Sequence, residues 1–587
     1  MNTEEAYRLR IASDPHIAGD EVYYTVNWIE DNEYRSSIYR MNSGKQERMT
    51  FGGHEKKPFF RGGSLYYIYS TREEESLMVI EGNKEPAKLL TAKSISKYLF
   101  HDDGILAIIQ DKADAKKPFV TEKVRYRFDG QGLFRSRKKL VLIQKEPKEL
   151  VSGDFDVTDL STNGKRIVFS STKEDDNTGS EDVYELDIAT MKTRRITSGT
   201  GMSSPVLITE NGEIAYLGHR KGKIPWAATK LIFPEKGEEI EIGKSASNSV
   251  GSDLFVPAAQ SLKFDAGAFY MIGQEGGSSF LYRYDGKVTK MTAEGISVRS
   301  FDVSGGKIAY VYTSHLKPSV LSFGFEIDLN EGVKGIIPQK ITANGMEAWL
   351  LLSGKENPTI VAVHGGPHTA YGNTYNIEFN YLVSNGFNVL YGNPRGSDGY
   401  GEEFARQVAG DWGGKDFDDI VSFMEEAKKR FGLIENFAIT GGSYGGYMTN
   451  SVITKTDRFR AAVSERSVSN LLSMCGTSDI GFWFNAVESG VEDPWSPEGM
   501  RTLMEMSPIS KAKNVRTPTL FVHGEEDYRC PIEQSEQMYT AIRLNGVDAS
   551  LARYPGDSHE HARRGVPANM KDRLERKLNW FSKYCKQ

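Results

Sequence analysis

The sequence predicts a two-domain protein, with an all-β N-terminal half and a C-terminal half in which strands alternate with helices. The chain has 587 residues, whereas a single hydrophobic core usually stops growing at about 250 to 300 residues. Short strands bounded by glycine-rich turns fill the first half, and from about residue 330 apolar strands alternate with helix-length segments. We therefore assign residues 1–328 and 329–587 to separate domains.

A repeated strand signal organises the N-terminal half. A glycine followed closely by a hydrophobic or aromatic run occurs seven times, with the first hydrophobic residues at positions 22, 65, 105, 167, 214, 269 and 308. Most intervals between them are near the about 40 to 50 residues that a four-stranded propeller blade needs. The repeat predicts a β-propeller, and a pair of generic β-sandwiches is the alternative. The longest interval, between 105 and 167, predicts an extended hairpin around residues 112–137.

The C-terminal half has the pattern of a mostly parallel sheet covered by helices on both faces. Alternation of strands with amphipathic segments is typical of βαβ units. Apolar runs predict strands at 348–351, 360–363, 387–390, 437–439, 461–463 and 520–522, and amphipathic stretches predict helices over 416–430, 447–455, 532–544 and 570–581.

Composition and charge exclude several classes of protein. The 73 Lys and Arg and 79 Asp and Glu residues are interleaved and sum to −6, so no basic stripe is present for nucleic acid. Three cysteines fit neither a disulfide framework nor a zinc pattern. The N-terminus has no apolar segment, and no stretch approaches the about 18 apolar residues of a membrane span. We expect a cytoplasmic protein without metal or cofactor.

The strongest chemical signal is a G-x-S-x-G sequence at residues 441–446. It follows a short predicted strand and opens a helical segment from Tyr447. Such a turn holds its serine in strained backbone angles, which requires glycine two positions before and after it. A glycine-rich turn can also bind a phosphate at a helix N-terminus, but the Walker lysine and the G-x-G-x-x-G spacing are absent. The pattern predicts Ser443 as a nucleophile.

A nucleophilic serine needs a general base and an acid that orients the base. In α/β-hydrolases these residues follow in the order Ser, acid, His. Three carboxylates at 525–527 follow a predicted strand, and we assign Asp527, the last of them, as the acid. His559 is the first histidine after the turn at 555–558 and is our candidate base, whereas His561, close to two arginines, is expected on the surface.

Acyl transfer also requires donors directed at the developing oxyanion. The backbone N–H of Tyr444, immediately after the nucleophile, is one candidate. The run His364-Gly365-Gly366-Pro367 follows an earlier strand and matches the HGG-type loop that supplies a second donor. We assign that role to the N–H of Gly366; a plain glycine-rich turn is the alternative.

Together these segments resemble a known family. The propeller-like half, the motifs at 364–367, 393–401 and 441–446, and His523-Gly524-Glu525-Glu526-Asp527 are similar to those of the prolyl oligopeptidase family of serine peptidases, and most of all to acylaminoacyl peptidases. The resemblance implies a seven-bladed propeller that caps an α/β-hydrolase domain, with the active site between them and access limited to short peptides. It also supports the triad and oxyanion-hole assignments.

The resemblance further implies substrate-binding residues. Arg529, two residues after the acid, would bind the carbonyl of the substrate's P2 position; pairing with Glu525 or Glu526 is the alternative. Phe482, Trp483 and Phe484 lie where this family builds the pocket for the residue that precedes the cleaved bond; the alternative is a place in the core. Relatives often have an N-terminal helix that assists dimerisation, and here a short helix within 3–12 is the most that fits. We expect a homo-oligomer.

The predicted function is the release of an N-acylated amino acid from short N-blocked peptides through an acyl-enzyme on Ser443. The propeller lacks the acidic pair in the setting of dipeptidyl peptidases, because the acidic run at 73–75 has the pattern of a charged turn. Two alternatives remain open. One is a carboxylesterase or an oligopeptidase of different specificity, and the other is a propeller interaction protein with an inactive hydrolase domain.

Overall fold

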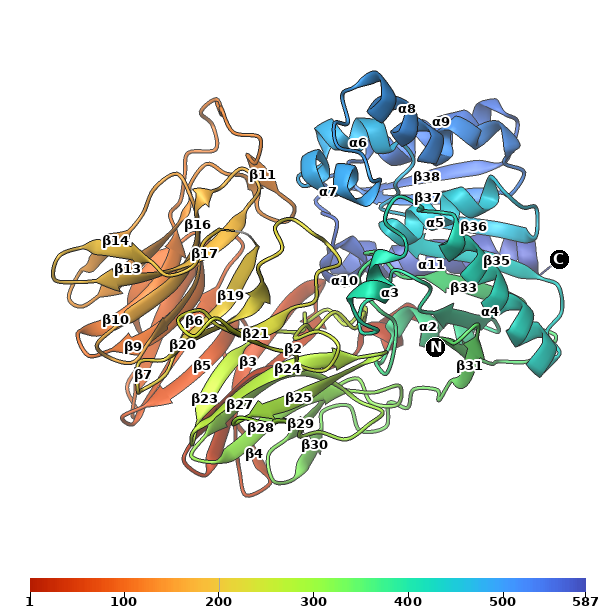
Figure 1. The fold of residues 1–587 in the computed structure, drawn as a ribbon. Helices are drawn as coiled ribbons and strands as arrows, with labels where there is room; N and C mark the ends of the chain where they lie inside the picture. Colours follow the sequence, from red (N-terminus) through yellow and green to blue (C-terminus); the bar gives the residue numbers. More distant parts are fainter. Residues whose placement is uncertain (200, 587) are drawn as a thin grey trace.

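The computed structural model describes residues 1–199 and 201–586 and contains two domains side by side (Figure 1). The N-terminal domain, red to green in Figure 1, is a propeller of seven four-stranded antiparallel sheets, which confirms the predicted fold class. Its blades are β1–β4 (Ile11–Ala18, Glu21–Glu30, Glu33–Asn42, Lys45–Arg48), β5–β8 (Glu55–Arg61, Ser64–Ser70, Glu75–Glu81, Ala87–Ala92), β9, β10, β13 and β14 (Ser94–His101, Gly104–Gln110, Lys138–Ile143, Pro147–Val151), β15–β18 (Val157–Thr162, Ile167–Asp175, Ser180–Asp187, Lys192–Arg195), β19–β22 (Met202–Ile208, Ile214–His219, Lys230–Phe233, Glu238–Ile240), β23–β26 (Leu262–Asp265, Ala268–Glu275, Ser278–Tyr284, Val288–Lys290) and β27–β30 (Ser297–Ser304, Lys307–Thr313, Val320–Ser322, Glu326–Asp328).

The glycine-led signal marks the same position in every blade. All seven runs fall in the second strand, namely β2, β6, β10, β16, β20, β24 and β28. A second strand has a partner on each side and begins at a tight turn, which is why a glycine precedes a buried apolar run. The ring closes where the first and last blades pack together, and there the N–H of Ile17 donates to Asp302 at 2.8 Å.

The third blade carries the extended hairpin that the long interval predicts. Residues 111–137 leave the blade after β10 and return to it at β13, and near their middle β11 (Arg127–Phe128) pairs with β12 (Gly132–Leu133). Figure 1 shows β11 at the end of the propeller that faces the second domain. The excursion therefore extends from the propeller toward the other half of the molecule.

The C-terminal domain is built on an eight-stranded sheet with the order β31-β32-β34-β33-β35-β36-β37-β38. β32 pairs antiparallel with β31 and β34, and every neighbouring pair from β34 to β38 is parallel. The strands are Gln339–Ala343, Met346–Leu351, Thr359–Val363 (β33), Asn388–Gly392 (β34), Phe437–Gly442, Phe459–Glu465, Thr519–Gly524 and Ala549–Tyr554.

Helices cover both faces of this sheet, as the alternating pattern predicts. Apolar side chains of α4, α5 and α9 pack on one face, and those of α1, α2 and α11 pack on the other. The helices are α1 (Thr3–Tyr7), α2 (Ile377–Ser384), α3 (Glu402–Arg406), α4 (Lys415–Phe431), α5 (Tyr444–Ile453), α6 (Leu471–Thr477), α7 (Gly481–Glu488), α8 (Pro497–Met506), the 3-10 helix η1 (Pro508–Asn514), α9 (Glu533–Leu544), α10 (His561–Arg564) and α11 (Pro567–Cys585).

The N-terminal helix packs on the C-terminal domain. It spans Thr3–Tyr7, capped by Asn2, and is shorter than the predicted limit of 3–12 because β1 begins at Ile11. The Thr3 hydroxyl donates to Glu575 of α11 at 2.7 Å. The two domains are also joined between the end of β30 at Asp328 and the start of β31 at Gln339. Within the described residues, no helix is both long and apolar enough to span a bilayer.

Candidate active site

The turn between β35 and α5 has the geometry that the G-x-S-x-G pattern predicts. Ser443 sits at φ 62° and ψ −122°, a strained conformation for a residue with a side chain. A Cβ at Gly441 would lie 2.5 Å from the carbonyl oxygen of Gly445, and one at Gly445 would lie 2.2 Å from that of Val363. Only glycine therefore fits on either side of the serine. The helix begins at Tyr444, three residues earlier than predicted.

Asp527 and His559 form a buried pair at the ends of β37 and β38. The Nδ1 of His559 donates to Asp527 Oδ2 at 2.8 Å. The backbone N–H groups of Arg529 and Cys530 donate to Oδ1 at 3.0 and 2.8 Å. Burial acts to raise the pKa of Asp527, but His559 and a hydrogen bond from His523 hold the pKa of this carboxyl well below its usual range. The carboxylate is thus ionised at neutral pH and orients the imidazole, whose Nε2 makes no hydrogen bond to the described residues.

Ser443 and His559 line the same cavity, although no hydrogen bond joins their side chains in the described chain. The Oγ of Ser443 instead lies 3.8 Å from the Sγ of Cys530. Catalytic hydrogen bonds in unliganded sites are often long and shorten when substrate binds. The geometry brings the proposed nucleophile and the proposed base into the same cavity without joining them.

The cavity lies between the two domains and has a volume of about 530 Å³. The hydrolase side contributes the serine turn, the loop around Gly366 and the segment around His559, and the propeller side contributes residues 248–254 and Arg299. Ligand sites commonly have volumes of about 300 to 1,000 Å³. A short peptide is therefore of a suitable size for this enclosure.

Two backbone N–H groups are available beside the serine. Tyr444 is the first residue of α5, and Gly366, at φ 121°, lines the cavity in the loop after β33. Neither N–H donates to another residue of the described chain. His364 supports this loop, because its Nε2 lies 2.8 Å from Ser397 Oγ and burial lowers its pKa to about 4, which keeps it neutral. The pair is positioned to receive an oxyanion.

Arg529 lines the cavity and is held by a carboxylate that the sequence did not predict. Its Nε and Nη2 donate to Asp479 at 2.7 and 3.2 Å, and its guanidinium lies 4.9 Å from the ring of Phe128 in the propeller hairpin. Glu525 pairs instead with Arg553 at 3.0 Å. The alternative, in which the guanidinium pairs with Glu525 or Glu526, is therefore wrong, and the fixed guanidinium remains on the cavity wall.

Of the three aromatic residues in α7, only Phe484 is among the described residues that line the cavity. Its ring lies 6.2 Å from that of Trp412, another cavity residue. Trp483 contacts the propeller instead, where the ammonium of Lys223 lies 5.2 Å from its ring. The expectation that Phe482 and Trp483 also form the pocket is corrected: α7 presents one aromatic residue in three to the cavity.

His561 is buried, which corrects the expectation that it lies on the surface. Its exposed fraction is 1%, its ring stacks on Tyr554 at 6.2 Å, and its Nε2 lies 3.8 Å from Glu465. The neighbouring arginines suggested exposure, but the short helix α10 turns His561 inward and leaves Arg564 half exposed. It is not among the described residues that line the cavity, which is consistent with a structural role.

Asp129, a propeller residue that the sequence analysis does not predict, contacts the loops that carry Asp527 and His559. Its carboxylate accepts the backbone N–H groups of Tyr528 at 3.0 Å and of His559 at 3.1 Å. These partners are about 400 residues away in the chain. The only available signal was the long interval between 105 and 167, which predicted the hairpin but not its contacts.

Thiol reagents should leave the activity largely intact, because all three cysteines are buried. Burial raises the pKa of Cys475 to about 11, that of Cys585 to about 12, and that of Cys530 well above its usual value. The reactive thiolate is therefore scarce at neutral pH. We expect iodoacetamide at pH 7.5 to change the rate of peptide hydrolysis by less than about twofold, with mass spectrometry reporting unmodified cysteines. Rapid inactivation with alkylated Cys530 would contradict this expectation.

Fold and site together define a serine hydrolase capped by a propeller. Residues 25–318 match the family described as acylaminoacyl-peptidase, N-terminal β-propeller domain, and residues 373–587 match the prolyl oligopeptidase family. The chain belongs to the prolyl oligopeptidase family of peptidases, and it is a serine peptidase.

Individual relatives agree with this assignment. The uncharacterized peptidase YuxL of Bacillus subtilis is 32% identical over 97% of each chain. The acylamino-acid-releasing enzyme of Arabidopsis thaliana is 35% identical over 40% of this chain and 31% of its own length. Among solved structures, the uncomplexed acylaminoacyl peptidase of Pyrococcus horikoshii is 25% identical, with a TM-score of 0.87 over 100% of this chain and 98% of that one.

Proposed function

We propose that this peptidase releases an N-acylated amino acid from short peptides whose N-terminus is blocked. The observation that carries the proposal is the buried pair of Asp527 and His559 beside the serine turn, in a cavity of about 530 Å³ between the domains. Relatives named acylamino-acid-releasing enzymes support the choice of substrate class.

Each proposed residue has one chemical task. His559 takes the proton of Ser443 as the hydroxyl attacks the carbonyl carbon, and Asp527 holds the imidazole and stabilises its charged form. The N–H groups of Tyr444 and Gly366 bind the oxyanion of the tetrahedral intermediate. His559 then protonates the leaving amine, and a water activated by the same imidazole hydrolyses the acyl-enzyme and frees the N-acylated amino acid.

The charges around the cavity favour a blocked N-terminus. A free α-amine needs an available carboxylate, yet the four carboxylates that line the cavity in the described chain all have partners. Asp253 accepts two backbone N–H groups, Glu378 and Glu465 bind cations of α11, and Glu560 binds Arg563. An acylated N-terminus carries no charge and needs no such partner, so the cavity suits it better.

The remaining substrate contacts follow from the cavity wall. We propose that Arg529, fixed by Asp479, donates to the carbonyl at the P2 position of the substrate, which in an N-acylated amino acid is the carbonyl of the acyl group, because a guanidinium presents two donors in one plane. Phe484 would contact an apolar side chain at the acylated residue. We also propose that the protein is a homo-oligomer and, because its three cysteines form no disulfide framework, that it acts in the cytoplasm.

A panel of four substrate types tests this proposal. We expect N-acetyl-amino-acid anilides to be cleaved with a kcat/KM at least about tenfold above that of free aminoacyl anilides or proline-containing peptides. p-Nitrophenyl esters serve as a control for the intrinsic reactivity of the serine. Fast ester cleavage without amide turnover would indicate an esterase, and a preference for free amines would overturn the proposed substrate class.

A further inference from the structure

The tip of the propeller hairpin joins the two loops that carry the proposed acid and base. Oδ1 of Asp129 accepts the backbone N–H of Tyr528 at 3.0 Å and that of His559 at 3.1 Å, and its Oδ2 lies 3.2 Å from the same nitrogen of His559. Tyr528 is adjacent to Asp527 in sequence. One carboxylate from the other domain therefore bridges the backbones of both catalytic loops.

Its neighbours in the hairpin reinforce this contact. The backbone N–H of Asp129 donates to Asp479 at 2.8 Å, the carboxylate that also holds Arg529. The guanidinium of Arg127 lies 4.8 Å from the ring of Tyr528 and donates to the carbonyl of Thr477. Arg127 and Asp129 thus contact α6, the loop after it and both catalytic loops, and Phe128 between them lies 4.9 Å from the guanidinium of Arg529.

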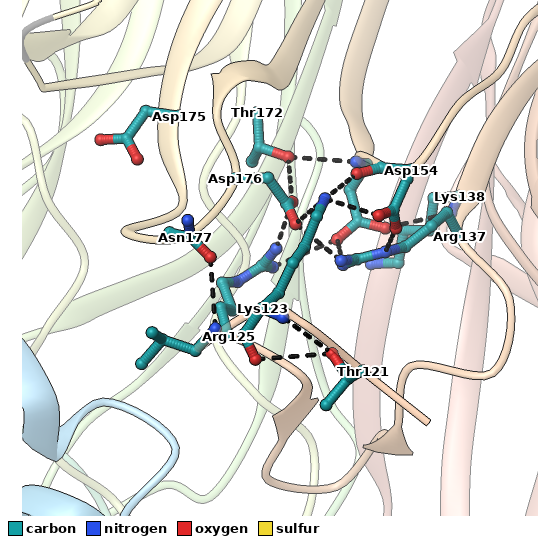
Figure 2. Close-up of polar contacts among 12 residues, drawn as sticks. Thr121, Lys123, Arg125, Arg137, Lys138, Asp154, Thr172, Asp175, Asp176 and Asn177 are labelled. Atoms are coloured by element: carbon teal, nitrogen blue, oxygen red, sulfur yellow. Dashed lines mark hydrogen bonds and ion pairs between the residues drawn. The ribbon is translucent and has the colours of Figure 1, made fainter. Parts of the chain in front are cut away.

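The base of the hairpin is fixed by a cluster of ion pairs, drawn in Figure 2. Lys123 and Arg125 precede the tip, Arg137 follows it, and all three converge on the carboxylate of Asp176 beside β16, at 3.1, 2.8 and 2.6 Å. Asp154 and Asp156 complete the cluster.

Burial makes this anchor stiff. The side chains of Asp176 and Arg137 are 6% and 10% exposed, and the guanidinium of Arg137 also lies 4.6 Å from the ring of Phe134. Separating a buried ion pair is costly, because each charge is then left in the protein interior without its partner. Because its base is held in this way, the hairpin keeps Asp129 at its tip in a fixed position relative to the propeller.

We propose that this hairpin positions the catalytic histidine and that Asp129 is the positioning residue. The inference rests on the proposed role of His559. A carboxylate close to Asp527 is unfavourable by itself, and burial and then the charge of Asp527 raise the pKa of Asp129. Its two N–H donors compensate for this, since hydrogen bonds to a charged acceptor are the strong ones. The propeller thereby completes the active site as well as enclosing it.

Hydrolysis kinetics of Asp129→Ala and Asp129→Asn test this inference. We expect kcat on an N-acetyl-amino-acid anilide to fall about 10- to 100-fold in the Ala variant with a smaller change in KM, because a displacement of about 1 Å in a catalytic group costs about that much. The Asn variant keeps one acceptor oxygen and should lose less. Gln131→Ala is the matched control, because Gln131 is exposed in the same turn.

Two readouts separate positioning from simple enclosure of the substrate. Labelling of Ser443 by a small fluorophosphonate should slow in parallel with kcat, and hydrogen exchange of residues 555–564 should become at least about fivefold faster. A rise in KM with unchanged kcat and labelling would overturn the inference, as would unchanged exchange in a folded Asn or Ala variant. Ser443→Ala and His559→Ala are measured in the same assay. Activity retained in those two variants would reject the proposed triad, a failure separate from any result at Asp129.

Discussion

Replacement of Ser443 by alanine is expected to lower kcat for peptide hydrolysis by about 10⁶-fold, the size of effect that follows loss of a triad nucleophile. The hydroxyl is placed at the strained turn between β35 and α5, beside two N–H groups that donate to no other residue of the described chain. The variant still binds substrate and keeps both N–H donors, but it cannot form the acyl-enzyme. Single-turnover and steady-state rates on an N-acetyl-amino-acid anilide measure the loss.

The control for this variant is Ser510→Ala, an exposed serine of η1 that should retain full activity. Thermal unfolding should show that both variants keep the fold, since Ser443 makes no short side-chain hydrogen bond in the described chain. If Ser443→Ala retained peptide hydrolysis, another nucleophile would be at work. Cys530, 3.8 Å away, would be the first to examine.

The parts of the site that the sequence predicts are those in which local geometry restricts residue choice. The turn at Ser443 tolerates no Cβ at Gly441 or Gly445, so the steric restriction lies within five consecutive residues. The seven glycine-led strands are equally local, because each begins at a tight turn and is buried between two partners. Local restrictions of this kind leave a readable pattern in the sequence.

The parts that the sequence does not predict depend on contacts between distant segments. Asp129 meets Tyr528 and His559 across about 400 positions, and no spacing rule connects a turn in a propeller blade with a loop of another domain. Asp479 is not predicted for the same reason, because it lies 50 residues from Arg529 in sequence, whereas Glu525 and Glu526 are near neighbours. Burial of His561 depends on the direction of one short helix, which charge in the neighbouring sequence does not reveal.

A second large effect is expected on stability from Arg573→Met in α11. Arg573 is 1% exposed, and its Nη1 lies 2.7 Å from Glu378 and 3.2 Å from Glu465. Removing one partner from a buried charge cluster leaves the others uncompensated and typically costs about 3 to 5 kcal/mol. We expect the free energy of unfolding of this domain, measured by urea denaturation, to fall by about that amount.

Arg576→Met supplies the matched control one turn along the same helix. Arg576 pairs with Asp572 at 2.5 Å, but its side chain is 54% exposed, and exposed pairs contribute only about 0 to 1 kcal/mol. The two variants remove the same kind of group from the same helix, so the difference between them isolates burial. Equal losses would contradict the assignment of a large cost to the buried cluster.

The buried cluster also bears on the proposed catalysis, because it holds the strand end that supports Ser443. The N–H of Ser443 donates to the carbonyl of Glu465 at 3.1 Å, and the side chain of Glu465 is held by Arg573 and Lys577. Arg573→Met should therefore lower kcat at temperatures where the variant is still folded.

A fourfold variant separates this effect from the loss of stability. Replacing Arg573, Lys577, Glu378 and Glu465 together by apolar residues of similar volume should restore stability, because the desolvation cost disappears together with the attraction. If kcat stayed low in that stable variant, the cluster would be needed to shape the serine turn; if kcat recovered, its effect on activity would act through stability alone.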